Sequence, residues 1–360
     1  MASARMITAM GLAALVLAGG VQASEVQVRH RFEQVGPVKV FYREAGNPQA
    51  PTVLLLHGYA ASSFMYRNLI PMLADRYHVI APDLPGFGFT EAPARGDYAY
   101  TFEQLTRTIE QFTEQLKLDR YALQVFDYGA PVGWRLALAH PSRVSAIISQ
   151  NGNAYEEGLG SGWAPIQTYW KDPSQANREA LRDFPTPASI QWQYLEGVPD
   201  QSLVAPDAIA LESFLVSRPG NAEIQLDLLL DYASNVEMYP RFQAYFREYQ
   251  PPMLAVWGRN DPFFLPAGAQ AWKRDIPNAD VRFYDTGHLA LETHGVEIGA
   301  VIRQFLNAGV IDELTMSVIP ILLGSGIPLF SNGSREHGLK LLEARPYPSG
   351  LTQLRYALTA

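Results

Sequence analysis

Residues 121–133 read Tyr121-Ala-Leu-Gln-Val-Phe-Asp127-Tyr-Gly129-Ala-Pro-Val-Gly133, and this stretch decides the fold. The apolar run up to residue 126 predicts a strand buried on both faces, and residues 129–139 predict a helix. A tight turn between them would lift Asp127 above the sheet edge, where backbone N–H groups and the helix dipole converge. Aspartate is also a common N-cap, so this turn alone supports a nucleophile and a plain cap equally.

Strands and helices alternate on both sides of this turn. The sequence predicts strands at 38–42, 52–56, 78–81, 144–149, 253–257 and 281–284, and helices at 64–73, 102–116, 268–274 and 296–306. Such alternation is typical of an α/β protein with a mostly parallel sheet covered on both faces.

Two segments break the alternation. Residues 155–246 are rich in aromatic residues and helix-like patches, which predicts a helical cap inserted between two parts of one core, 24–154 and 247–308. We expect the cap to cover the carboxyl ends of the strands, where ligands bind in open α/β sheets. The tail, 309–360, predicts short strands near 316–320, 339–343 and 351–358.

Two further residues stand at predicted strand ends. Asp261 lies in Gly-Arg-Asn-Asp-Pro after one strand, and His288 lies in Asp-Thr-Gly-His-Leu after the next. The order Asp127, Asp261, His288 is the nucleophile, acid, histidine order of a strand–turn–helix nucleophile fold. Asp285 is a rival acid, but so close to the histidine it is better placed to shape the turn. These three positions together predict a catalytic triad.

The segment His57-Gly-Tyr59-Ala-Ala-Ser follows another buried strand. This position supplies a second oxyanion donor when the nucleophile follows the neighbouring strand. The backbone N–H groups of Tyr59 and Tyr128 are therefore predicted to stabilise negative charge beside Asp127.

The motifs HGYAAS, PDLPGFG, FDYGAPVG, GRND and DTGH together resemble the α/β-hydrolase superfamily over residues 26–308. The aspartate nucleophile resembles the epoxide hydrolase and haloalkane dehalogenase branches. A carboxylate can displace a leaving group at saturated carbon and form an ester, and His288, held by Asp261, can then activate water to hydrolyse it. The resemblance implies a small apolar substrate and water as reactants, and neither a metal nor an organic cofactor is needed.

The substrate depends on departures from the family pattern. Dehalogenases of this kind place Trp after the nucleophile and often Asn in the oxyanion motif, whereas this chain has Tyr128 and Tyr59. Epoxide opening needs a phenol acid from the cap, and the candidates are Tyr155, Tyr169, Tyr194 and Tyr232. The sequence favours an epoxide hydrolase, with a haloalkane dehalogenase and a non-catalytic binding protein of the same fold as alternatives.

Composition and the N-terminal sequence restrict the possible classes of protein. The net charge of −8 argues against a nucleic-acid partner, and the absence of cysteine excludes thiol catalysis and disulfides. Residues 1–23 have the basic start, short apolar run and small residues of a secretory signal peptide, which predicts a periplasmic or secreted protein. No other apolar run is long enough to span a bilayer.

The tail carries a second resemblance. Residues 306–330, with Leu341-Leu-Glu-Ala-Arg and Gln353-Leu-Arg-Tyr, are similar to the C-terminal half of the riboflavin-biosynthesis reductase domain. The glycine-rich nucleotide segment of that domain is missing, so neither NADPH binding nor reductase activity is expected. Strands without their sheet partners leave unpaired edges, which predicts pairing with a second copy or poor order.

Overall fold

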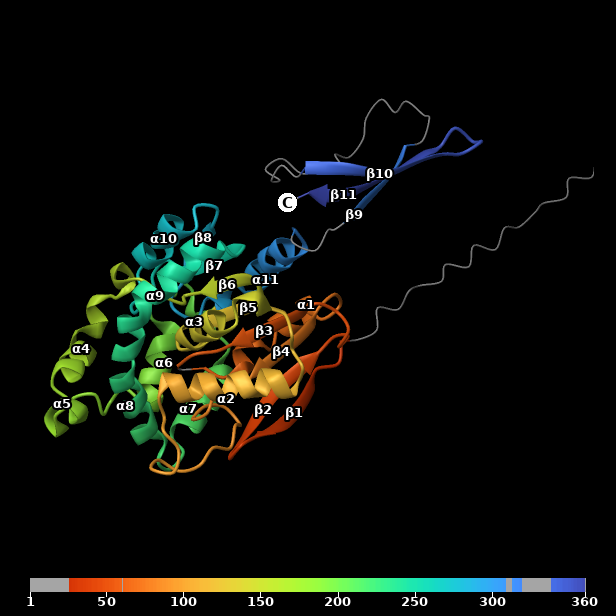
Figure 1. Cartoon of the computed structure of the whole chain (residues 1–360). Coiled ribbons are helices and arrows are strands. Elements are labelled where there is room, and N and C mark those ends of the chain that lie inside the picture. The colour runs from red at the N-terminus through yellow and green to blue at the C-terminus, as the bar shows by residue number, and fades with distance from the viewer. Residues whose placement is uncertain (1–25, 60, 309–312, 319–337, 360) are drawn as a thin grey trace, which may run out of the picture.

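The computed structural model describes residues 26–59, 61–308, 313–318 and 338–359, and the predicted signal peptide lies outside them. A central sheet carries helices on both faces, a group of helices lies beyond one end of the strands, and a small second sheet follows the last helix (Figure 1). The predicted α/β architecture with a helical insertion and a β-rich tail is therefore confirmed.

The central sheet has eight strands in the order β1-β2-β4-β3-β5-β6-β7-β8. Only the β1–β2 and β2–β4 pairs within it are antiparallel. The strands are β1 (Arg29–Val35), β2 (Val38–Ala45), β3 (Thr52–Leu56), β4 (His78–Pro82), β5 (Tyr121–Phe126), β6 (Val144–Gln150), β7 (Met253–Gly258) and β8 (Asp280–Tyr284). Every residue of β5 is buried, as the apolar run predicted.

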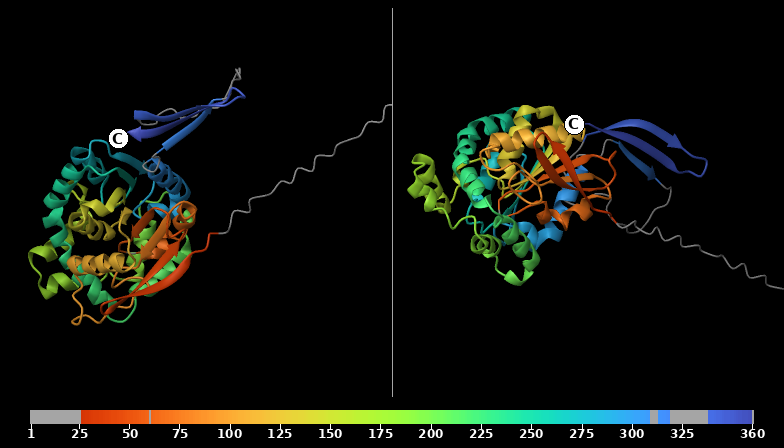
Figure 2. Two further views of the ribbon diagram at one scale, coloured as in Figure 1. Left: turned by 45° about the vertical axis from the view of Figure 1, so that its right-hand side comes forward. Right: turned by 90° about the horizontal axis from the view of Figure 1, so that it is seen from below.

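The core helices pack in two layers (Figures 1 and 2). Helices α2 (Phe102–Gln115) and α3 (Gly129–Ala139) contact each other on one face of the sheet, and α1 (Leu69–Leu73) contacts α11 (Ala290–Ala308) on the other. Helix α10 (Pro266–Asp275) completes the α3 side. These layers bury both faces of the parallel strands, which is why the strands read as apolar runs.

Two helix predictions need correction. The helix predicted over 64–73 is a 3-10 turn, η1 (Ser63–Tyr66), followed by the short helix α1, because Ser62 caps the turn separately. Helix α11 begins at Ala290, earlier than predicted, because non-helical backbone at His294 interrupts the apolar periodicity. A second 3-10 turn, η2 (Pro141–Arg143), follows α3.

The segment between β6 and β7 contains helices and no strand. It comprises η3 (Glu156–Gly158), η4 (Ser161–Trp163), α4 (Ala164–Lys171), α5 (Gln175–Glu179), α6 (Pro187–Leu195), η5 (Gln201–Leu203), α7 (Pro206–Val216), α8 (Asn221–Asp231) and α9 (Ala233–Tyr249). The Tyr59 hydroxyl, from the turn after β3, donates to Phe184 O in this segment at 2.9 Å. The cap therefore contacts the turns at the carboxyl ends of the strands.

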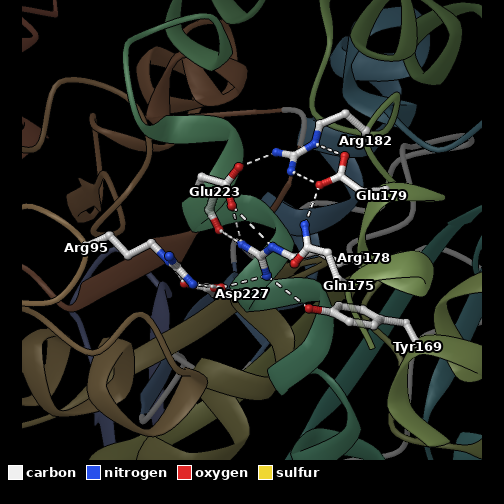
Figure 3. Close-up of polar contacts among 8 residues, drawn as sticks. All are labelled: Arg95, Tyr169, Gln175, Arg178, Glu179, Arg182, Glu223 and Asp227. Carbon is white, nitrogen blue, oxygen red and sulfur yellow. Dashed lines mark hydrogen bonds and ion pairs between the residues drawn. The ribbon is translucent and has the colours of Figure 1, made fainter. Parts of the chain in front are cut away.

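An ion-pair network also joins the cap to the core (Figure 3). Asp227 of α8 accepts from Arg95, in the core loop before α2, at 2.5 Å, and pairs with Arg178 of α5 at 2.9 Å. Arg178 and Arg182 both contact Glu223, one turn earlier on α8. Because arginines from the core loop and from the α5 region meet two carboxylates of α8, the network fixes α5 and α8 against the core loop.

The tail forms a separate three-stranded antiparallel sheet, with β9 (Glu313–Val318), β10 (Gly338–Pro346) and β11 (Thr352–Thr359) in the order β10-β11-β9. Strands β10 and β11 confirm two of the predicted elements, and β9 overlaps the third, predicted near 316–320, of which residues 319 and 320 lie outside the described ranges. The sheet lies outside the helix-covered core in both views of Figure 2. Leu339, Leu341 and Leu342 on β10 are exposed. Within the described ranges, the helices are all too short or too polar to cross a bilayer.

Candidate active site

Asp127 occupies a strained turn between β5 and α3. Its φ of +45° lies in the left-handed region, which a non-glycine residue adopts only when its surroundings impose it. The turn is closed by Ala130 N–H, which donates to Asp127 O at 2.9 Å. A Cβ at Gly129 would lie 2.2 Å from Leu56 O, so only glycine lets β3 approach this closely. The predicted strand–turn–helix geometry is therefore present.

The Asp127 carboxylate is held by backbone N–H groups. Tyr59 N–H donates to Asp127 Oδ1 at 2.5 Å, and Tyr128 N–H also contributes a hydrogen bond. A Cβ at Gly58 would lie 2.4 Å from the same oxygen, so glycine is required for the close approach. Both predicted donors thus bind the carboxylate, Tyr59 N–H at Oδ1, and Oδ2 is the oxygen that lies nearer to His288.

His288 stands between the two aspartates. Its Nδ1 lies 2.8 Å from Asp261 Oδ2, and its Nε2 lies 3.8 Å from Asp127 Oδ2. The second distance is too long for a hydrogen bond, which leaves His288 oriented by Asp261 rather than by Asp127. The structure thus brings all three predicted residues together, and only 6% of Asp127 and 1% of His288 is exposed.

Asp261 depends on a residue that the sequence reasoning did not assign to the site. Asn151, directly after β6, donates from Nδ2 to Asp261 Oδ2 at 2.6 Å, and its Oδ1 accepts from Gly258 N–H at 3.1 Å. Phe263 and Phe264 N–H groups donate to Asp261 Oδ1. The sequence signal for Asn151 was its position at a strand end, but its contact with Asp261 spans 110 residues.

Burial and neighbouring charges shift the pKa values of Asp127 and His288. Burial raises the pKa of Asp127 to about 6, although His288 and the two backbone N–H groups act to lower it. Burial alone would lower the pKa of His288, but the Asp261 carboxylate raises it above the ordinary value. Phe126, Phe263 and Phe264 surround the imidazole at ring-centroid distances of 4.7, 5.5 and 5.9 Å. The aromatic wall explains the strong desolvation.

The side chains of the two oxyanion-side tyrosines differ. The Tyr59 hydroxyl is engaged with Phe184 O, so only the backbone of Tyr59 is available to a reacting group. The Tyr128 hydroxyl is buried and has no hydrogen-bond partner among the described residues. Its ring lies 5.6 Å from that of Tyr232. A buried phenol without a partner is costly and marks a place where a ligand oxygen can accept.

The structure brings one of the four predicted cap tyrosines toward Asp127. Tyr232 is buried at the start of α9, and burial, Tyr239 and then Asp127 raise its pKa well above the usual range. Tyr155 is not placed there, because its hydroxyl donates to Asp275 Oδ2 at 2.9 Å. Tyr169 accepts from Arg178 at 2.9 Å. Burial and then the carboxylates of Glu212 and Glu292, which lie on other helices, raise the pKa of Tyr194. The contacts of Tyr155 and Tyr169 correct those two predictions, whereas Tyr194 and Tyr232 stay predictions, of which the ring contact with Tyr128 favours Tyr232.

Indole groups near the site are already engaged. Trp163 packs 4.6 Å from the Tyr232 ring and 5.5 Å from Phe264, but its Nε1–H donates to Phe263 O at 3.0 Å. Trp170 donates to Leu229 O at 2.7 Å. Neither indole N–H is therefore available to hold a halide.

In the described part of the chain, one group offers a ligand set for a metal ion. Glu110, Glu114 and His140 have ligand atoms within 4.8 Å of one another at the ends of α2 and α3. His140 Nε2 already lies 2.5 Å from Glu110 Oε1, and Arg143 pairs with Glu114. This surface cluster includes none of the residues around Asp127.

The chain belongs to the alpha/beta hydrolase fold family, whose model matches residues 51–295. It is 47% identical over 278 residues to an uncharacterized hydrolase of Saccharomyces cerevisiae, which covers 76% of this chain and 95% of that protein. It is 34% identical over 282 residues to a haloalkane dehalogenase of Psychrobacter cryohalolentis. This match covers 75% of this chain and 88% of that protein. The protein is thus an α/β-fold hydrolase.

A solved structure agrees with this fold. An epoxide hydrolase from Vigna radiata aligns with a TM-score of 0.62 at 21% identity, covering 78% of this chain and 98% of that one. At this level of identity the match supports the fold and leaves the reaction to be argued from the site.

Proposed function

We propose that the protein hydrolyses a small apolar epoxide through an ester on Asp127. The observation that carries this proposal is a pair of buried phenols beside the nucleophile. The Tyr128 hydroxyl has no described partner, and Tyr232 lies in the electrostatic field of Asp127. An epoxide oxygen needs a proton donor as its ring opens, and these hydroxyls supply it.

The first half-reaction forms the ester. Asp127 Oδ2 attacks one epoxide carbon, the carbon–oxygen bond of the ring breaks, and a proton from Tyr128 or Tyr232 reaches the leaving oxygen. Burial raises the pKa of each phenol well above its usual range, which keeps both hydroxyls protonated at neutral pH. The product of this step is a hydroxyalkyl ester of Asp127.

The second half-reaction releases the diol. His288 Nε2 takes a proton from water, and the resulting hydroxide attacks the ester carbonyl carbon. The carbonyl oxygen that becomes negative is Oδ1, which already accepts from Tyr59 N–H. The bond between that carbon and the alkyl oxygen then breaks, and the proton passes from His288 to the diol. The remaining proton of the water, now on the Asp127 carboxyl, returns to the phenolate that the first half-reaction left, so both groups regain their starting protonation. One oxygen of Asp127 is therefore replaced from water.

Trapping the ester tests the reaction. His288→Gln, incubated separately with styrene oxide and 1-bromobutane, should accumulate an adduct on Asp127 that intact-protein mass spectrometry detects. Asp127→Asn is the matched control and should give none. An adduct with the epoxide alone identifies an epoxide hydrolase, whereas no adduct from either compound on folded protein would favour the binding-protein alternative.

Haloalkane hydrolysis is the second candidate, favoured by the 34% identity to a haloalkane dehalogenase. The phenols discriminate between the two substrates. Tyr128→Phe with Tyr232→Phe should lower kcat/KM for styrene oxide by about a hundredfold or more, because it removes general-acid catalysis. Ester formation from 1-bromobutane needs no proton and should change little. An unchanged epoxide rate would overturn the assignment of the acids.

A further inference from the structure

His57 is a buried histidine that takes no part in the steps proposed above. It directly follows β3, and β4 runs parallel beside β3, with Leu54 opposite Ile80. Because parallel neighbours end at the same edge of a sheet, the turns that follow β3 and β4 lie next to each other. His57 therefore stands between the turn that carries Tyr59 and the turn that begins at Asp83.

The two ring nitrogens of His57 have different roles. Leu84 N–H lies 2.9 Å from Nε2, and because a backbone N–H can only donate, Nε2 is the unprotonated nitrogen. Burial lowers the pKa of His57, against the effects of Asp83 and of the Gly58 carbonyl, so the ring is neutral and its proton is on Nδ1. Nδ1 lies 3.0 Å from Gly58 O, which can only accept. The Nδ1–H therefore donates to Gly58 O.

The hydrogen bond to Gly58 O orients the N–H of Tyr59. The Gly58 carbonyl and the Tyr59 N–H belong to one planar peptide unit, which is trans, so the two groups point in opposite directions. A contact that fixes the carbonyl consequently fixes the direction of the N–H, which binds Asp127 Oδ1 at 2.5 Å. This unit needs a restraint, because a glycine permits wide rotation of the peptide that follows it. Phe87 packs edge-on against the His57 ring at a centroid distance of 5.5 Å, which holds the imidazole in place.

The two turns are also joined by contacts that do not involve His57. The buried carboxylate of Asp83 accepts from Ser63 N–H and from Phe89 N–H, each at 2.7 Å. The N–H of Asp83 donates to Phe41 O on β2 at 2.8 Å. These contacts should keep both turns in place when the His57 ring is altered, so the task of His57 is local.

We propose that His57 is a positioning residue, which holds the Gly58–Tyr59 peptide unit so that Tyr59 N–H stays directed at Asp127 Oδ1. His57 acts through the backbone and touches neither the nucleophile nor a substrate atom. The use of this N–H during ester hydrolysis rests on the proposed function. Its effect on the ionisation of Asp127 does not, and this effect can be measured without a substrate.

Two amide substitutions separate the roles of the two ring nitrogens. His57→Asn places its amide near the position of Nδ1, where it can donate to Gly58 O. His57→Gln places its amide near the position of Nε2, where it can accept from Leu84 N–H but cannot reach the carbonyl. Only the first variant should therefore keep the Tyr59 peptide unit in its orientation.

NMR titration of the Asp127 carboxyl in protein with isotope-labelled aspartate is the measurement. Because the Tyr59 N–H lowers the pKa of Asp127, His57→Gln should raise the midpoint of this titration by about one pH unit. His57→Asn should restore most of the parent midpoint. His288 and Asp261, whose charges also act on Asp127, are the same in both variants.

His78→Gln is the matched control, because His78 is also buried and contacts Glu44 away from the site. It should leave the midpoint unchanged. An unshifted midpoint in His57→Gln, or an equal rise in His57→Asn, would overturn the proposal. If His57→Gln does not fold, nitrogen NMR of the parent imidazole still decides, since a proton on Nε2 would overturn the proposal as well.

A kinetic measurement separates this proposal from the proposed function. His57→Gln should slow ester hydrolysis by about tenfold or more, because negative charge develops on Oδ1 in that step, and His57→Asn should restore the rate. A shifted titration without any ester from epoxides would reject the proposed function and support the role of His57. An active epoxide hydrolase with an unshifted titration in His57→Gln would reject the role of His57 alone.

Discussion

At the scale of single residues, Asp127 combines a strained backbone with a buried carboxylate. The left-handed φ of +45° is imposed by the contact of Gly129 with β3 and by the hydrogen bond that closes the turn. The same position surrounds the carboxylate with aromatic rings and few charges. Its reactivity is therefore controlled by ionisation as well as by geometry.

The pH dependence of ester formation follows from Asp127. In the proposed reaction only the ionised carboxylate attacks, and burial raises the pKa of Asp127 to about 6. The rate of ester formation should rise about tenfold per pH unit below pH 6 and level off above it. Rapid-quench measurement of the adduct between pH 4.5 and 8 would show this. A rate that is already constant at pH 5 would contradict the raised pKa.

In the proposed reaction neutral His288 activates the water that hydrolyses the ester, and the pKa of His288 is raised by Asp261 against the effect of burial. Hydrolysis should therefore increase as the pH rises through a value above 6.5. The two half-reactions should separate in pH, with ester accumulating in mildly acidic solution.

Glu212 gives a prediction on stability. Burial raises the pKa of Glu212 to about 8. The Asp83 carboxylate also raises this pKa, whereas the Ser62 hydrogen bond and Arg43 lower it. The Tyr194 hydroxyl lies in the electrostatic field of Glu212. Because the pKa of Glu212 is higher in the folded than in the unfolded protein, protonated Glu212 contributes stability. This contribution is fully present below the unfolded-state pKa near 4.5 and is lost as the pH rises through 8. Glu212→Gln should thus be about 2 kcal/mol or more stabilising at pH 8.5 and near neutral at pH 4.5.

Calorimetric unfolding at the two pH values measures this difference. Glu91→Gln is the matched control, because Glu91 is an exposed carboxylate paired with Lys39. Its effect should be small at both pH values. An equal effect of Glu212→Gln at pH 4.5 and 8.5 would show that Glu212 does not titrate in this interval.

At the scale of elements, strand ends made much of the site predictable. Asp127, Asp261 and His288 each follow a parallel strand, and parallel strands bring such turns to one edge of the sheet. The role of Asn151 was not predictable, because an amide that binds a distant carboxylate has no local pattern. Four cap tyrosines were equivalent in the sequence, and only the packing of α9 placed Tyr232 beside Tyr128.

The cap network yields a prediction for α8. Asp227→Asn removes the pairing with Arg95 and Arg178, and should destabilise the cap by about 1 kcal/mol. Amide hydrogen exchange in α8 should accelerate, and added salt should reduce the difference from the parent protein.

Asp75→Asn serves as the control for this prediction, because Asp75 pairs with Arg303 of α11 outside the cap. It should leave exchange in α8 unchanged. Identical exchange in the parent and in Asp227→Asn would mean that the ion pairs contribute nothing to cap closure.

At the scale of the whole molecule, the core and the tail are separate sheets. A chain that ends at Ala308 should retain ester formation and unfold within a few degrees of the full chain, because the enzyme residues all precede that point. Light scattering of both chains would show whether the tail pairs two copies. Loss of folding on truncation would contradict the independence of the core. The signal peptide stays a prediction, checked by the N-terminus of exported protein.

The cap enters and leaves the core through neighbouring strands. It follows β6 and precedes β7, which pair in parallel from Ile147 opposite Met253 to Gln150 opposite Val256. Because the strands are parallel, its two attachment points are on adjacent strands but at opposite ends of them, the carboxyl end of β6 and the amino end of β7, and α9 precedes the return. A cap of another length or sequence can bridge these two points without altering the strands that carry Asp127, Asp261 and His288. The cap can therefore change, and the substrate range with it, while the residues of the proposed reaction stay the same.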